Sequence, residues 1–189
     1  MSSKKVYTLE KPDCSHEVLF EQLLFVKGMM DLATEEDLRF AERVDYLSQD
    51  LFYMDVCGRI SSRLNFHLNL YSNELMINIL KEKVKWDVKR PYVIAKDFGI
   101  HLQHTLPFTT GVGPSYPSGH AALSRLYAHY LSAIFEDLRA DLFNYSNRVC
   151  FSRLHVGVHF LRDIEAGKYL ADCFFEDRKE EIYRKISVD

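Results

Sequence analysis

The stretch Ser152-Arg-Leu-His-Val-Gly-Val-His-Phe-Leu-Arg-Asp163 combines an arginine, a histidine and a carboxylate at spacings that suit phosphoryl chemistry. His159 and Asp163 are four residues apart, so a helix that begins near His159 would place them on one face. The carboxylate would then hold one imidazole nitrogen as N–H and leave a nucleophilic lone pair on the other. Arg153 lies six residues before His159, across a Gly157 that allows a turn, and offers a planar donor fork to an anion. A local hydrogen bond and a surface arginine are the alternative explanations.

Apolar residues at helical spacing continue from this stretch and recur through the rest of the chain. They predict a final helix from His159 to about Ile186. They also predict helices over residues 16–32, 34–57, 59–66, 72–89, 118–138 and 142–153. Thr34 is the expected N-cap of the helix over residues 34–57. Pro91 is expected to end the helix over residues 72–89. The prediction is an all-α compact helical bundle, with residues 1–14 as an irregular lead-in and residues 15–189 as a single helical domain.

The composition, 47% hydrophobic and 27% charged, is that of an ordinary globular protein. A net charge of −3 gives no reason to expect nucleic acid or an acidic membrane surface as a partner. The cysteines Cys14, Cys57, Cys150 and Cys173 lack metal-binding spacing, so we expect mostly buried thiols of a reducing compartment. The N-terminus is charged where a signal peptide is apolar, and no apolar run is long enough to span a bilayer. We therefore expect a soluble cytoplasmic protein, and formation of a homo-oligomer stays open.

A second stretch, Lys83-Val-Lys-Trp-Asp-Val-Lys-Arg-Pro91, is rich in basic residues. Lys83 and Arg90 are seven residues apart. If both lie on the predicted helix, they face the same way, separated by roughly 10 Å along its axis, and can bend toward one anion. The alternative is a solvated basic face that interacts favourably with the dipole at a helix C-terminus.

A third stretch, Tyr116-Pro-Ser-Gly-His120, is placed where a long loop leads into a predicted helix. Ser118 can act as N-cap, and the free amides of Gly119 and His120 would then form an anion cradle at the positive end of the helix. His120 would be held beside the bound group, close enough to give or take a proton. The alternative is an ordinary capped helix start with an incidental histidine.

The loop before this helix, residues 97–117, holds three of the five prolines of the chain. Long loops inside compact domains are commonly functional, so we expect this one to form a lip over the site. His101, His104 and Tyr116 are the expected lid or substrate contacts on it.

Together the three stretches read Lys-x6-Arg-Pro, Pro-Ser-Gly-His and Ser-Arg-x5-His-x3-Asp, in that order along the chain. This resembles the signature of the type 2 phosphatidic acid phosphatase superfamily, which also contains the bacterial nonspecific acid phosphatases and the vanadium-dependent haloperoxidases. The resemblance covers residues 83–163 directly. It implies the all-α bundle of the acid phosphatase and haloperoxidase type.

The resemblance also implies roles for individual residues. His159 would attack phosphorus and form a phosphohistidine, Asp163 would orient it, and His120 would protonate the leaving oxygen and then activate water. The groups expected to hold the phosphoryl oxygens are Lys83, Arg90, Arg153, the Ser118 hydroxyl and the Gly119 amide. No metal or other cofactor is required, and vanadate is expected to inhibit. The expected substrate is a small soluble phosphomonoester or phosphoanhydride.

Three alternatives stay open. In a vanadium-dependent haloperoxidase the same residues would hold vanadate as cofactor; the short chain and Gly113, where those enzymes tend to carry histidine or phenylalanine, favour a phosphatase. A metal site is the second alternative, with the candidate ligands His101, His104, His155 and His159. A non-catalytic anion-binding module is the third, although a binder has no need for both His120 and the His159–Asp163 pair.

Overall fold

The computed structural model describes residues 7–58, 60–102 and 110–187. Within these ranges the chain is all-α and has no strand, which confirms the predicted fold class. None of the helices in the described part is both long and apolar enough to cross a membrane. The elements are α1 (His16–Leu32), α2 (Glu35–Arg43), α3 (Gln49–Val56), α4 (Ser62–Trp86), α5 (Pro91–Ile94), η1 (Ala95–Phe98), α6 (Gly119–Ser132), η2 (Glu136–Leu138), α7 (Arg139–His155) and α8 (Leu161–Ile186).

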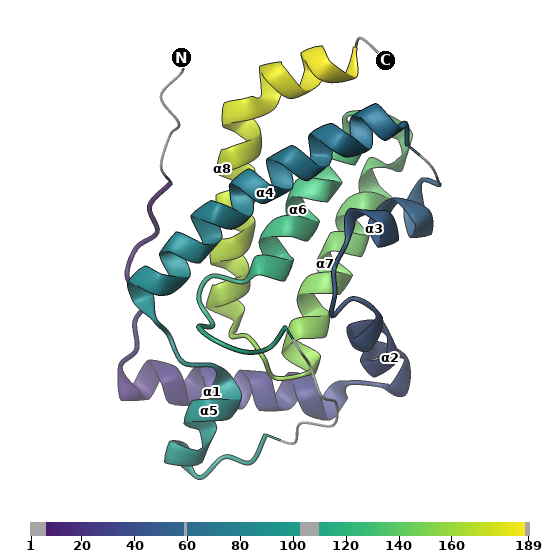
Figure 1. Cartoon of the computed structure of the whole chain (residues 1–189). Coiled ribbons are helices and arrows are strands. Elements are labelled where there is room, and N and C mark those ends of the chain that lie inside the picture. The colour runs from purple at the N-terminus through teal and green to yellow at the C-terminus, as the bar shows by residue number, and fades with distance from the viewer. Residues whose placement is uncertain (1–6, 59, 103–109, 188–189) are drawn as a thin grey trace.

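Helix α6 lies in the middle of the bundle. It packs along α7 and α8, and α4 crosses α6 and α8 (Figure 1). The short helices α2 and α3 pack against α7, and α1 runs across the end of the bundle where α7 finishes. Apolar side chains from α4, α6 and α8 form one core, among them Leu75, Leu126, Tyr130, Leu170 and Phe174. This core fixes the positions of the helix ends that carry the sequence motifs.

A glycine allows α8 to approach the start of α6. A Cβ atom placed on Gly167 would lie 2.4 Å from the backbone oxygen of Ser118 and 3.1 Å from the Cβ of Ala121. In the same region the amide of Ser118 donates a hydrogen bond of 2.8 Å to the carbonyl of Asp163. The first turns of the two helices are therefore in direct backbone contact.

The prediction of a single helix over residues 34–57 is wrong. The expected Thr34 cap is present, and α2 begins after it, but the chain leaves the helix at Val44 and re-enters one at Gln49. Ser48 caps α3 by accepting a hydrogen bond from the Leu51 amide at 3.3 Å. Asp45, between the two helices, is buried against Arg153. The break brings this carboxylate into the protein.

The prediction for the next helix was also inaccurate. Residues 62–86 form one helix, because buried Leu64, Leu68, Leu75 and Ile79 continue a single apolar stripe across the expected gap. The helix ends at Trp86, before Pro91, where Asp87 adopts a left-handed conformation with φ of 43°. Proline instead occupies the first turn of α5, a position that needs no amide hydrogen.

Two further helix boundaries differ from the prediction. The helix expected over residues 118–138 ends at Ser132 and is followed by the turn η2. The last helix begins at Leu161 instead of His159, because the Asp163 carboxylate accepts a hydrogen bond of 2.9 Å from the Phe160 amide and so marks the helix start. His159 therefore precedes α8 and does not belong to it.

The four cysteines are free thiols, but they are less buried than predicted. Cys150 is buried, Cys57 and Cys173 are partly buried, and Cys14 is exposed. Cys14 lies in the irregular segment before α1, where the chain has not yet entered the bundle.

Gly167→Ala should lower the free energy of unfolding by about 1–3 kcal/mol, because the new methyl group has to displace the Ser118 carbonyl. Urea denaturation measures the change. Gly28→Ala is the matched control: a Cβ there meets no atom within 4 Å. Alanine's helix propensity should leave that variant as stable as the native chain or up to about 1 kcal/mol more stable. Equal stability of the Gly167→Ala variant and the native protein would contradict the close-contact interpretation.

Candidate active site

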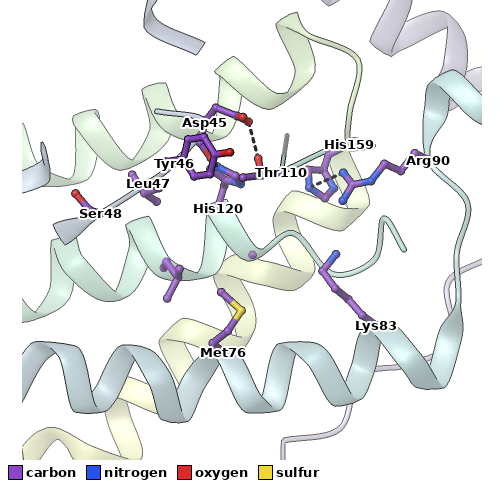
Figure 2. A pocket seen from close by; sticks show the side chains of 12 residues that line it. Asp45, Tyr46, Leu47, Ser48, Met76, Lys83, Arg90, Thr110, His120 and His159 are labelled. Atoms are coloured by element: carbon purple, nitrogen blue, oxygen red, sulfur yellow. Dashed lines mark hydrogen bonds between the residues drawn. The ribbon is translucent and has the colours of Figure 1, made fainter. Parts of the chain in front are cut away.

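A cavity of about 430 Å³ opens beside the start of α6 (Figure 2). It brings together five of the residues predicted for the site, from three different motifs: Lys83, Arg90, Gly119, His120 and His159. The other described residues that line it are Asp45, Tyr46, Leu47, Ser48, Met76, Thr110 and Leu123. The cavity thus has a cationic and imidazole-lined end and an apolar wall.

His159 lies at the cationic end of the cavity, where it is only 3% exposed. Its Nδ1 atom is 3.3 Å from the Asp163 carboxylate, and its Nε2 atom is 3.3 Å from Nη1 of Arg90. Burial, followed by the charges of Arg90 and Lys83, lowers the pKa of His159 well below its ordinary value. The imidazole is therefore neutral at neutral pH. The sequence placed the His–Asp pair on a helix, whereas the structure forms it across the helix start.

Asp163 is completely buried and is held by several donors. Its Oδ2 atom accepts hydrogen bonds from the Ser115 hydroxyl and from the Phe160 amide, the latter at 2.9 Å. Burial raises the pKa of Asp163, and these two hydrogen bonds oppose the rise. The Ser115 hydroxyl also lies 3.5 Å from Nδ1 of His159. Ser115 thus contacts both members of the pair.

Lys83 and Arg90 face the same cavity, but not for the reason expected from the sequence. Arg90 is the N-cap of α5 and lies outside α4, so the two are not a turn-spaced pair on one helix. Their charged groups are held by backbone carbonyls: Lys83 Nζ donates to Pro114 at 2.6 Å, and Arg90 donates to Gly113 at 3.0 Å and Val158 at 2.8 Å. Burial, and then the charge of Arg90, lowers the pKa of Lys83 to about 7.

The start of α6 has the geometry predicted from Pro-Ser-Gly-His. Ser118 is the N-cap, and its hydroxyl accepts a hydrogen bond from the Ala121 amide at 3.3 Å. Gly119 and His120 are the first residues of the helix and line the cavity, so their amides have no acceptor within the helix. Ser118 itself is completely buried. Its hydroxyl caps the helix, and Ser118 is not among the described residues that line the cavity.

His120 is held by the segment that separates α2 and α3. Its Nε2 atom lies 3.1 Å from the carbonyl oxygen of Val44 and 3.0 Å from that of Asp45. Burial, and then the nearby charge of Arg153, lowers the pKa of His120 to about 3. The side chain is therefore neutral, and its Nε2 hydrogen points at backbone carbonyls.

Arg153 is buried and is not among the described residues that line the cavity. The side chain is 1% exposed, and its Nη1 atom is 3.2 Å from Oδ1 of Asp45. Its remaining donors reach the Ser152 hydroxyl at 3.0 Å and the Ala41 carbonyl at 2.6 Å. Burial lowers the pKa of Arg153 to about 10, so the guanidinium stays charged at neutral pH.

Neither of the described residues predicted as lid contacts, Tyr116 and His101, is among the described residues that line this cavity. Tyr116 is buried, and its hydroxyl donates to the Glu10 carbonyl at 3.2 Å, on the side of the lead-in segment. His101 is exposed and is not among the described lining residues, and His104 lies outside the described part of the chain. The loop instead contributes Thr110 to the cavity and its carbonyls to the cations.

Of the histidines proposed as metal ligands, His104 lies outside the described residues, and His155 and His159 line different hollows. His155 lines a separate hollow on the other side of α7 and lies 4.0 Å from Asp37. Among the residues that the structure describes, no three histidine, cysteine or acidic side chains are grouped as a metal site. The donor set of the cavity is that of an anion site.

The match to known families agrees with this geometry. A model of the PAP2 superfamily matches residues 64–175, which is more than half of the chain. The chain belongs to the PAP2 superfamily. No curated protein matches it. PAP2 membership supports a phosphatase-type hydrolase activity, and the matched range contains all three motifs.

Sequence reasoning missed several residues that shape the site of this PAP2 protein. Ser115 is next to a predicted motif but was not assigned a role, although it contacts both His159 and Asp163. Asp45 gave no signal, because a single carboxylate in an acidic region resembles a surface residue. The apolar wall comes from residues of several elements, which share no spacing along the chain.

Ser115→Ala should lower the free energy of unfolding by about 1.5–3 kcal/mol, since the buried Asp163 carboxylate loses a hydroxyl donor. The change is measured by urea denaturation. Ser132→Ala is the control, because that hydroxyl only donates to the His129 carbonyl in its own helix at 3.0 Å. A Ser115→Ala variant no less stable than Ser132→Ala would show that the hydroxyl does not support the carboxylate.

Proposed function

We propose that the chain is a metal-independent phosphatase that hydrolyses phosphomonoesters or phosphoanhydrides through a phosphohistidine intermediate. One observation carries the proposal: Nδ1 of His159 is beside the Asp163 carboxylate at 3.3 Å, while Nε2 faces Arg90 on the cavity. A neutral imidazole that donates through one nitrogen has a lone pair on the other. That lone pair faces Arg90, one of the cations that would hold a phosphoryl group.

The reaction takes two steps. In the first, Nε2 of His159 forms a P–N bond while the P–O bond to the leaving group breaks, and doubly protonated His120 gives its second proton to the leaving oxygen and becomes neutral. In the second, His120 removes a proton from water, the water oxygen forms a new P–O bond, and the P–N bond breaks. Asp163 keeps the Nδ1 hydrogen in place through both steps. The products are an alcohol, or a second phosphate, and inorganic phosphate.

His120 must carry a proton to act as the acid. The pKa of about 3 reflects burial and the charge of Arg153, both of which disfavour a second positive charge. A phosphoryl anion in the cavity acts in the opposite direction and raises this pKa. Substrate binding and protonation of His120 are therefore coupled.

The charge of the transition state would be stabilised without a metal ion. Lys83, Arg90, Gly119 and His120 line the cavity, and their cationic groups and helix-start amides would supply the donors. Such an arrangement fits the equatorial oxygens of five-coordinate phosphorus. Vanadate adopts the same geometry, so it should inhibit as a transition-state analogue.

His159→Ala should reduce the hydrolysis of an aryl phosphate by about a thousandfold or more, because the nucleophile is removed. The assay is run with purified protein in chelator, with vanadate titrated in parallel. His155→Ala is the matched control, since His155 lies in the separate hollow on α7. Its activity should equal that of the native chain, and melting curves should show both variants folded.

The other outcomes point to the alternatives. An active His159→Ala variant would rule out this nucleophile. Activity lost in chelator and restored by Zn²⁺ would indicate metal-dependent chemistry. Bromide oxidation by peroxide that requires added vanadate, without phosphate hydrolysis, would identify a haloperoxidase in which vanadate is the cofactor.

The pH dependence of hydrolysis should show the loss of the proton from Lys83. Its pKa of about 7 means that the ammonium loses its proton, and with it the charge that binds phosphate, as pH rises through neutrality. The value of kcat/KM, which reports the free enzyme, should therefore fall above about pH 7. Lys83→Arg should move this fall to higher pH, because the guanidinium stays protonated.

The control for this pH profile is Lys85→Arg. Lys85 lies over the Trp86 ring, 4.2 Å from its centre, and is not among the described residues of the cavity. Its profile should match that of the native protein. If Lys83→Arg leaves the alkaline limb in place, another group is responsible for that limb.

A further inference from the structure

Asp45 lies between the cavity and Arg153. It lines the cavity and is 6% exposed, whereas Arg153 is 1% exposed and is not among the described lining residues. Oδ1 of Asp45 is 3.2 Å from Nη1 of Arg153 and also accepts a hydrogen bond from the Thr110 hydroxyl. Figure 2 shows this second contact beside His120. The carboxylate that pairs with Arg153 therefore belongs to a residue that lines the cavity.

The carboxylate supplies the kind of charge that a phosphoryl oxygen would bring. Among the described contacts of Arg153, the Ser152 hydroxyl and the Ala41 carbonyl are neutral, and Asp45 is the anion. The guanidinium is also close enough to Arg90 for the two charges to oppose each other. A negative group at this position is therefore strongly stabilised, whether it belongs to Asp45 or to a ligand.

The same short segment engages the proposed acid. The carbonyls of Val44 and Asp45 lie 3.1 and 3.0 Å from Nε2 of His120. Residues 44 and 45 thus contact both Arg153, which the resemblance implies as a ligand of the phosphoryl oxygens, and His120, the proposed acid. Movement of Asp45 away from Arg153 would also change the surroundings of His120.

We infer that Asp45 competes with the phosphoryl group for Arg153 and thereby weakens the binding of phosphate anions at the active site. This inference rests on the proposed function. The competition acts on substrate and on product, so return of the carboxylate to Arg153 promotes release of inorganic phosphate. Asp45 is then a specificity-determining residue that limits product inhibition.

The test is calorimetric binding of inorganic phosphate, which requires no turnover. Asp45→Asn keeps the size of the side chain and removes its charge, so the dissociation constant should fall by about tenfold. Glu42→Gln removes one negative charge from an exposed position of α2 and should leave binding unchanged. The gain should disappear in the double variant Asp45→Asn/Arg153→Gln, because the guanidinium that receives the ion is gone.

The Lys83→Met variant tests whether the phosphate ion binds in this cavity, because Lys83 lines it. If Lys83→Met weakens binding and Asp45→Asn binds phosphate no more tightly than the native chain, the competition is wrong and the proposed function stands. If phosphate binding is absent from all variants, or is insensitive to Lys83→Met, the proposed function fails together with this inference.

Loss of the buried counterion will lower the stability of Asp45→Asn. Because phosphate is expected to bind this variant more tightly, its melting temperature should rise more on addition of phosphate than that of the native chain. If this variant does not fold, Thr110→Val gives the second measurement, because it leaves both charges and removes the hydroxyl that holds the carboxylate. Phosphate should bind a few-fold more tightly to Thr110→Val, and unchanged or weaker binding would overturn the inference.

Discussion

The close contact between the first turns of α6 and α8 is the constraint on which the site depends. The absence of a side chain at Gly167 leaves room for the Ser118 carbonyl, and the Ser118 amide binds the Asp163 carbonyl at 2.8 Å. His120 follows Ser118 by two residues, and His159 precedes Asp163 by four. The backbone contact therefore holds the two chain segments that carry the imidazoles next to each other.

Burial gives these groups their chemical properties. Lys83 and Arg90 are largely removed from water, and their charged groups donate instead to carbonyls of residues 112–115 and of Val158. Burial, and then the charge of a neighbouring arginine, lowers the pKa of Lys83 and of His120, because both disfavour additional positive charge. A site with several buried cationic groups has a strong electrostatic preference for an anion. The PAP2 match and the geometry thus lead to the same class of chemistry.

The segment between α2 and α3 adds a negative charge to this cationic site. It lies outside the matched residues 64–175, yet it provides Asp45 to Arg153 and two carbonyls to His120. A cationic site that binds phosphate very tightly would release its product slowly. A carboxylate placed at one of the cations moderates that affinity, and the break in the helix predicted over residues 34–57 is what brings it there.

The sequence by itself determined the all-α fold, most of the helices and the identity of the cationic and imidazole residues, because helical periodicity and motif spacing are local properties. It placed Lys83 and Arg90 together on an incorrect helix, and it gave Arg153 a direct place at the phosphate. Only the tertiary structure decided that Arg153 is paired with Asp45, 108 residues away, and that Ser115 supports Asp163. Such contacts depend on how helices pack, and packing joins residues whose separation in the chain carries no signal.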